Sequence, residues 1–228
     1  MYIKIIKLDK VDSTNNYASK AALCGAREIA VVSARTQSLG KGRMGRQWVS
    51  VPGKGIYASF ILRPANTLKE INYLPLFSAL ATARFLENIL GKECKKNKDT
   101  EKVRIKIKLP NDIMINGKKA VGILVEAKTT GKKPSFVIIG IGININSLKQ
   151  ELPEHATSLF VETGQKYDID KIFPKLIKEM VIVYKDFKKG KINSLLREVL
   201  AFGAAGSVKE IEEMFDSRNK AGEVVHFV

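Results

Sequence analysis

Residues 103–127 read VRIKIKLPNDIMINGKKAVGILVEA, and their hydrophobic pattern determines the class of fold. Apolar and charged residues alternate from Val103 to Lys108, as they do in a strand with one buried face. Three further strands are predicted, at Ile113–Ile115, Ala120–Ala127 and Phe136–Ile143. The first two flank Asn116-Gly117, a dipeptide typical of tight hairpin turns. Four strands therefore follow one another, and the central pair forms a hairpin.

The residues on either side of this run add helices and more strands. Strands are predicted at Tyr2–Leu8, Ile29–Ala34 and Ile56–Leu62, and helices at Asn15–Leu23, Leu74–Leu90 and Ile169 to about Leu200. The last segment, Gly203–Val228, alternates like strands and is too short to form an independent core. Helices segregated around runs of strands favour an α+β fold over a doubly wound α/β sheet. We therefore expect a mixed, mainly antiparallel sheet packed by helices over residues 1–188, and a small β-rich segment over residues 189–228.

The composition predicts a strongly basic protein of the cytoplasm. No stretch reaches the ~20 apolar residues of a membrane helix, and the first ten residues alternate Ile and Lys unlike a signal peptide. A net charge of +16 should attract phosphates, acidic proteins or nucleic acid, without choosing among them. Cys24 and Cys94 lie far apart and the chain has only two histidines, so we expect reduced thiols and no zinc or disulfide framework.

A glycine-rich, cationic loop precedes the strand at Ile56–Leu62. Gly40-Lys41-Gly42-Arg43-Met44-Gly45 satisfies the dinucleotide pattern G-x-G-x-x-G, but that pattern requires a helix after its last glycine. Here β-like and turn-like residues follow, so a dinucleotide-binding fold is excluded. Glycines let backbone amides approach an anion, guanidinium groups match phosphate oxygens, and the indole of Trp48 can stack on a purine. The loop is either a nucleotide clamp or a basic surface loop with Trp48 in the core.

Four separated segments resemble the motifs of one family, the biotin–protein ligases. Residues 11–15, VDSTN, resemble the D-S-T-N element, and residues 36–48, TQSLGKGRMGRQW, resemble the loop T-Q-x-x-G-R-G-R-x-G-R-x-W. The third segment has two parts, residues 108–112, KLPND, and 117–126, GKKAVGILVE, which are similar to the pair K-W-P-N-D and G-K-K-x-x-G-I-L-x-E. Residues 140–144, GIGIN, are similar to G-x-G-I-N. Motifs in this order are far more specific than any one of them.

Two positions depart from the family pattern. Lys41 replaces an arginine of the loop, which keeps the charge but loses the bidentate fork. Leu109 replaces a tryptophan, which changes the packing near Lys108. The carboxy-terminal segment matches the family's small barrel-like domain poorly.

The resemblance implies a fold like that of class II aminoacyl-tRNA synthetases and biotin ligases. It implies an enzyme that activates biotin with ATP and Mg²⁺ to biotinyl-5′-AMP. The enzyme then transfers biotin to a lysine of a biotin carboxyl carrier domain, as biotin–[acetyl-CoA carboxylase] ligases do. Because the D-S-T-N element begins at Asp12, we expect the stand-alone catalytic form, without an amino-terminal DNA-binding domain, repressor activity or specific DNA binding. The family often forms homodimers, and no residue pattern decides that matter here.

The resemblance also assigns residues to roles. The biotin-binding positions are Ser13, Thr14, Asn15, Gln37, Gly40, Lys41, Arg43, Lys108, Gly122 and Gly142, and the ATP- and adenylate-binding positions are Arg43, Arg46, Trp48, Lys108, Lys119 and Asn144. Lys108 and Arg43 are the catalytic candidates, with the Lys108 ammonium between the biotin carboxylate and the α-phosphate. Both reacting groups are anions, so positioned cations suffice without a nucleophilic side chain. Asn111 and Asp112 are candidates to orient Lys108 or to help hold Mg²⁺, although no metal-ligand cluster is evident.

Other interpretations remain for several of these features. Without the family match, Lys108 is an ordinary strand-end lysine and Ser13 a helix cap. Lipoate ligases and octanoyltransferases share the expected fold, and they would lack the D-S-T-N and Gln37 constellation. The positive charge also fits a nucleic-acid-binding protein.

Overall fold

The computed structural model describes residues 3–91, 103–130, 133–219 and 225–227. Its strands are β1 (Ile5–Val11), β2 (Ala30–Gln37), β3 (Gly55–Leu62), β4 (Ile105–Lys108), β5 (Asp112–Ile115), β6 (Lys118–Thr130), β7 (Lys133–Asn144) and β8 (His226–Phe227). They form one sheet in the order β1-β2-β3-β7-β6-β5-β4, and β8 pairs with β6. The β1–β2 and β6–β8 pairs are parallel and the others antiparallel. The predicted mixed, mainly antiparallel sheet is confirmed.

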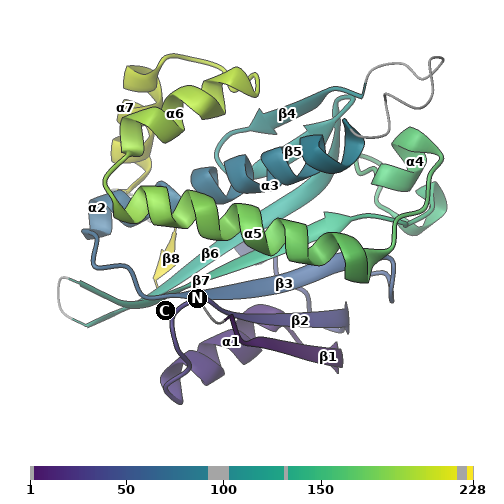
Figure 1. Ribbon diagram of the computed structural model, residues 1–228, viewed down its shortest axis with the longest axis horizontal. Helices are drawn as coiled ribbons and strands as arrows, with labels where there is room; N and C mark the ends of the chain where they lie inside the picture. Colours follow the sequence, from purple (N-terminus) through teal and green to yellow (C-terminus); the bar gives the residue numbers. More distant parts are fainter. Residues whose placement is uncertain (1–2, 92–102, 131–132, 220–224, 228) are drawn as a thin grey trace.

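Helices pack on both faces of the sheet, in unequal numbers (Figure 1). They are α1 (Thr14–Leu23), α2 (Leu68–Ile71), α3 (Leu74–Leu90), α4 (Leu159–Thr163), α5 (Ile169–Lys188), α6 (Ile192–Ala201) and α7 (Val208–Asn219). The α3 and α5 helices cover one face, whereas α1 lies on the other, against β2, β3 and β7. The face that α1 leaves open carries the pocket described below.

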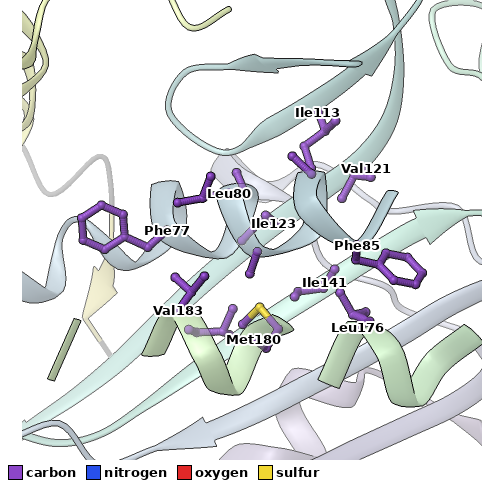
Figure 2. Close-up of a cluster of buried hydrophobic side chains, with 14 of the residues drawn as sticks. Phe77, Leu80, Phe85, Ile113, Val121, Ile123, Ile141, Leu176, Met180 and Val183 are labelled. Carbon is purple, nitrogen blue, oxygen red and sulfur yellow. The ribbon is translucent and has the colours of Figure 1, made fainter. Parts of the chain in front are cut away.

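The main core lies between the sheet and the pair α3 and α5 (Figure 2). Nearly every residue of α3 is buried, because this helix is enclosed by strands on one side and by α5 on the other. Met180 of α5 packs there close to Ile123 and Ile141 of the sheet. Burial of each such side chain stabilises the fold by roughly 1.5–3 kcal/mol.

The hairpin turn and several element boundaries follow the sequence-based expectation. Asn116 and Gly117 both have positive φ, 48° and 81°, as a tight hairpin turn with two left-handed residues requires. The helix predicted at Leu74–Leu90 has those bounds and ends at Gly91. The helix predicted from Ile169 to Leu200 is instead two helices, because the chain turns at Gly190, whose φ is 74°.

The prediction of a β-rich segment near the carboxyl end is wrong for most of that segment. Residues 192–201 and 208–219 are helical, and among the described residues after Lys188 only the two of β8 pair as a strand. At the start of α7, Ser207 and Glu210 form reciprocal capping bonds, Glu210 N to Ser207 Oγ at 3.2 Å and Ser207 N to Glu210 Oε2 at 2.6 Å. Ile211 and Phe215 then bury one helix face in the main core. The predicted linker 92–102, with Cys94, lies outside the described residues.

Candidate active site

The amino-terminal end of α1 and the end of β2 form one wall of a pocket. Val11 and Gln37 are opposite each other in the β1–β2 pair, so the start of α1 lies beside Gln37. The Oε1 atom of Gln37 accepts hydrogen bonds from Thr14 N at 2.8 Å and Thr14 Oγ1 at 3.0 Å. Ser13 occupies the N-cap position, but its buried side chain makes no capping hydrogen bond and lines the pocket instead.

Glycines of β6 and β7 form the floor of the pocket. Gly122 and Gly142 are paired across the two strands, and the indole of Trp48 lies on both of them. A Cβ atom added at Gly122 would come within 2.6 Å of the indole ring, so a side chain there is incompatible with this position of Trp48. The indole N–H is buried and has no hydrogen-bond partner within the described part of the chain. Trp48 therefore lines the pocket and is not part of the hydrophobic core.

The glycine-rich loop forms the opposite wall and is folded as a small hairpin. Lys41 and Gln47 form an antiparallel bridge, and Trp48 N donates to Gly40 O at 2.8 Å. At the tip, Met44 is exposed and has a φ of 55°, outside the range that most side chains adopt. Arg43 Nη1 donates to Asn111 Oδ1 at 3.0 Å, which ties the loop to the start of β5. The loop thus bridges the open edge of the pocket.

Cationic side chains dominate the ionisable groups around the pocket. Lys41, Arg43, Arg46 and Lys119 line it, whereas Asp112 is the one carboxylate among the described lining residues. Lys119 Nζ lies 2.8 Å from Asp112 Oδ1 and 5.8 Å from the centre of the Trp48 ring. The excess of positive charge suits an anionic ligand beside a flat aromatic group.

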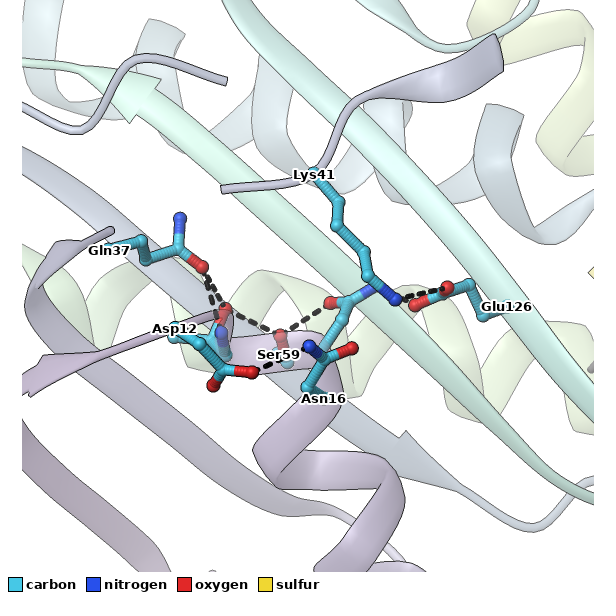
Figure 3. Close-up of polar contacts among 8 residues, drawn as sticks. Asp12, Asn16, Gln37, Lys41, Ser59 and Glu126 are labelled. Atoms are coloured by element: carbon cyan, nitrogen blue, oxygen red, sulfur yellow. Dashed lines mark hydrogen bonds and ion pairs between the residues drawn. The ribbon is translucent and has the colours of Figure 1, made fainter. Parts of the chain in front are cut away.

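A chain of hydrogen bonds runs beneath the pocket from α1 to the loop (Figure 3). Ser59 Oγ lies 2.8 Å from Thr14 Oγ1 and 2.6 Å from Asn15 Oδ1, and Asn15 Nδ2 donates to Glu126 Oε2 at 2.7 Å. Lys41 Nζ lies 3.2 Å from Glu126 Oε1. No role was predicted for Ser59 or Glu126 from the sequence. The available signal for Glu126 was its charge, because the strand 120–127 is otherwise apolar. Glu126 follows Gly122 and Leu124 at a spacing of two, so the three residues share one face of the strand.

Most of the predicted site residues come together in this pocket. Those that line it are Ser13, Thr14, Asn15, Gln37, Lys41, Arg43, Arg46, Trp48, Lys119, Gly122 and Gly142. Gly40, Lys108 and Asn144 do not line it. Gly40 is buried at the base of the loop, and the Asn144 amide is buried and donates to Thr157 O at 3.0 Å.

Lys108 lies beside the pocket, at the end of β4. It pairs with Asp112, which pairs with Gly122, which in turn pairs with Gly142. Residues paired directly across strands share a face of the sheet, so Lys108 belongs to the face that carries the pocket. Its side chain is exposed. The catalytic role of Lys108 stays a prediction.

Comparison with known proteins identifies the family. The Biotin/lipoate A/B protein ligase family matches residues 8–144, more than half of the chain. The chain belongs to this family. The bifunctional ligase/repressor BirA of Bacillus subtilis is 39% identical over 168 residues, which cover 72% of this chain and 48% of that protein. The biotin–[acetyl-CoA-carboxylase] ligase of Paracoccus denitrificans is 38% identical over 138 residues, 60% of this chain and 53% of that protein.

Solved structures agree with this assignment. A biotin protein ligase from Aquifex aeolicus, in complex with biotin and ATP, has a TM-score of 0.69 and 29% identity, and the match covers 86% of this chain and 76% of that one. A biotin protein ligase from Leishmania major, 23% identical with a TM-score of 0.60, shares the fold. The chain spans about half the length of the curated relatives it matches.

Two further findings bear on the expected class of protein. Across residues 3–91, 103–130, 133–219 and 225–227, no helix is both long and apolar enough to cross a bilayer. Within those same residues, no three histidine, cysteine or acidic side chains gather where they could hold a metal ion.

Proposed function

We propose that this chain is a biotin–protein ligase that forms biotinyl-5′-AMP from biotin and ATP and transfers biotin to a lysine of a carrier domain. The observation that carries the proposal is the meeting of two unlike walls over one glycine floor. Thr14 and Gln37 supply neutral hydrogen-bonding groups on one side, and Arg43 and Lys119 supply cations on the other. Such a pocket suits a ligand with a polar, uncharged head and an anionic end.

Biotin has this character. Its ureido ring carries two N–H donors and one carbonyl acceptor on an apolar bicycle, and its tail ends in a carboxylate. Ser13, Thr14 and Gln37 offer hydroxyl and amide groups for the ring, while Leu124, on the same strand face as Gly122, supplies apolar surface. The carboxylate would then point toward the cationic loop.

The first chemical step joins two anions. The biotin carboxylate oxygen forms a bond to the α-phosphorus of ATP, the bond from that phosphorus to the bridging oxygen breaks, and pyrophosphate leaves. Arg43, Arg46 and Lys119 would offset the repulsion and the charge that develops at phosphorus. Lys108, on the same face of the sheet, would reach the reacting groups with its long, flexible side chain. In the second step the acceptor amine attacks the acyl carbon, loses a proton and releases AMP.

The pocket would supply one carboxylate ligand to Mg²⁺ and not a complete set of protein ligands. Proteins hold nucleotide-bound Mg²⁺ through one or two carboxylates together with the phosphates. Asp112, which lines the cationic side of the pocket beside Lys119, would supply that carboxylate. Mg²⁺ would neutralise part of the triphosphate charge when bound there.

The acceptor in this proposal is the biotin carboxyl carrier domain of a biotin-dependent carboxylase, met in the cytoplasm. The net charge of +16 would steer an acidic acceptor toward the pocket. If transfer to the carrier is as fast at physiological salt as at low salt, steering of this kind does not operate. Specific DNA binding and a defined homodimer are not part of the proposal.

The decisive experiment incubates the chain with biotin, Mg²⁺ and α-labelled ATP, and looks for labelled biotinyl-adenylate. Adenylate should form with biotin and not with lipoate, and Arg43→Ala should lower its rate by about a hundredfold or more. Arg35→Ala is the matched control, because Arg35 is an exposed arginine that does not line this pocket. Adenylate formation with lipoate alone would assign the chain to the other branch of the family, and no adenylate with either acid would refute the enzyme assignment.

A further inference from the structure

Glu126 is a largely buried carboxylate that touches both walls of the pocket without lining it. Its side chain is 12% exposed, and it does not belong to the lining residues. The Oε2 atom accepts a hydrogen bond from Asn15 Nδ2 at 2.7 Å, and Oε1 lies 3.2 Å from Lys41 Nζ. Asn15 belongs to the α1 wall and Lys41 to the loop wall. One carboxylate thus joins two segments that are far apart in the sequence (Figure 3).

The charge of Glu126 fixes the orientation of Asn15. An ionised carboxylate only accepts hydrogen bonds, so Asn15 must turn its NH₂ group toward it. The Asn15 carbonyl oxygen then faces Ser59, and the short 2.6 Å contact requires the Ser59 hydroxyl to donate. The Thr14 hydroxyl gives its one hydrogen to Gln37 Oε1 at 3.0 Å, so its 2.8 Å contact with Ser59 shares the hydrogen that Ser59 donates to Asn15. Glu126 thereby determines that the carbonyl end of the Asn15 amide faces Ser59.

The same carboxylate holds the base of the loop. Lys41 lies between two glycines and begins the small hairpin at its bridge with Gln47. Glycines restrain the backbone little, so the ion pair with Glu126 supplies a restraint that the local sequence lacks. A mostly buried carboxylate is costly unless both of its oxygens have partners, and Asn15 and Lys41 are those partners.

We propose that Glu126 is a positioning residue: it sets the orientation of the Asn15 amide against Ser59 and holds Lys41 of the loop, and so controls biotin affinity without touching biotin. This inference rests on the proposed function. It differs from a merely structural role because it predicts loss of affinity from a substitution that keeps the shape of the side chain.

The test is a double-mutant cycle read by calorimetric titration with biotin. Glu126→Gln has the same shape, but its amide has one acceptor end, so its NH₂ group must face a donor on Asn15 or on Lys41. We expect this variant to bind biotin about tenfold more weakly. In a Lys41→Met background the conflict is removed, and Glu126→Gln should then change the dissociation constant by less than about twofold.

Two further measurements separate positioning from a general loss of folding. Glu28→Gln is the matched control, because Glu28 also accepts hydrogen bonds from two side chains, Tyr184 at 2.6 Å and Lys188 at 2.9 Å, away from the pocket. It should leave biotin binding unchanged. Glu126→Asp keeps the charge but is too short to reach both partners. It should weaken binding, and Lys41→Arg, whose side chain is longer, should restore part of that loss.

The outcomes are distinguishable. If the parent chain does not bind biotin, the proposed function fails. If the parent binds biotin and Glu126→Gln binds it equally well, or if Glu126→Gln has the same effect in both Lys41 backgrounds, the positioning role of Glu126 is overturned.

Discussion

Gly140→Ala tests the packing of Asn15 against the pocket floor. A Cβ atom at Gly140 would lie 2.9 Å from Asn15 Cγ and 3.0 Å from Asn15 Nδ2. Carbon atoms in normal contact are ≈ 3.5–4.0 Å apart, so the overlap amounts to roughly 0.5–1 Å. Asn15 is buried and held by Glu126 and Ser59, so it has no room to withdraw.

The expected cost follows from this geometry. Overpacking in a filled interior destabilises a protein by about 1–3 kcal/mol, and the immobile amide favours the middle of that range. For a chain of this size, about 2 kcal/mol corresponds to a fall of roughly 4–8 °C in the unfolding temperature. Thermal unfolding followed by circular dichroism, with urea unfolding as a second method, measures this change directly.

The control for Gly140→Ala is the same substitution in an Asn15→Ala background. Without the Asn15 amide, the three atoms nearest to the added Cβ are gone. The cost of Gly140→Ala should then fall to about zero, within the ~0.5 kcal/mol expected of independent sites. An equal cost in both backgrounds would refute the reasoning, because the destabilisation would then come from something other than the contact with Asn15.

Three other predictions concern the core, the pH dependence and the pocket. Met180→Ala should lower the unfolding free energy by about 2–5 kcal/mol in a urea titration, because it opens a cavity in the main core. A loss below about 1 kcal/mol would contradict the position of Met180 in that core. Burial opposes ionisation of Glu28, but hydrogen bonds from Tyr184 and Lys188 outweigh it and lower the pKa of Glu28. The stabilisation is therefore present at neutral pH and lost as the pH falls through this lowered pKa. The parent should be more stable than Glu28→Gln by a few tenths of a kcal/mol to about 1 at neutral pH, and this difference should shrink in acid. Thr14→Val should weaken biotin binding by about tenfold while Thr14→Ser does not, and equal affinities of the two variants would exclude a role for this hydroxyl.

Local signals in the sequence predicted much of the fold. The alternation of residues 103–108 and the Asn116-Gly117 turn act between neighbours in the chain, so they predicted the hairpin and the antiparallel sheet. The error at Val208–Asn219 has the same origin, because the local pattern of Gly203–Val228 was interpreted as strands although Ser207 and Glu210 form a capping box. Apolar residues at 208, 211 and 215 have helical spacing.

The sequence indicated which residues line the site better than it indicated the contacts between them. Motif residues as distant as Thr14 and Gly142 do line one pocket. The contacts of Asn15 with Ser59 and Glu126 span 44 and 111 residues, and no local pattern encodes such pairings. The adenine contact of Asn144 stays a prediction, and the bond from its buried amide to Thr157 O is a further pairing that no local pattern encodes.

The position of Trp48 offers the most direct test of the pocket itself. The indole lies on Gly122 and Gly142, two of the three glycines predicted to bind biotin, so the bicycle and the indole cannot occupy that surface together. Trp48 is also the one tryptophan of the chain, so its fluorescence reports on this site alone. We predict a saturable change in its emission when biotin is added, complete at one equivalent. An unchanged emission, at biotin concentrations where calorimetry detects binding, would show that biotin binds elsewhere.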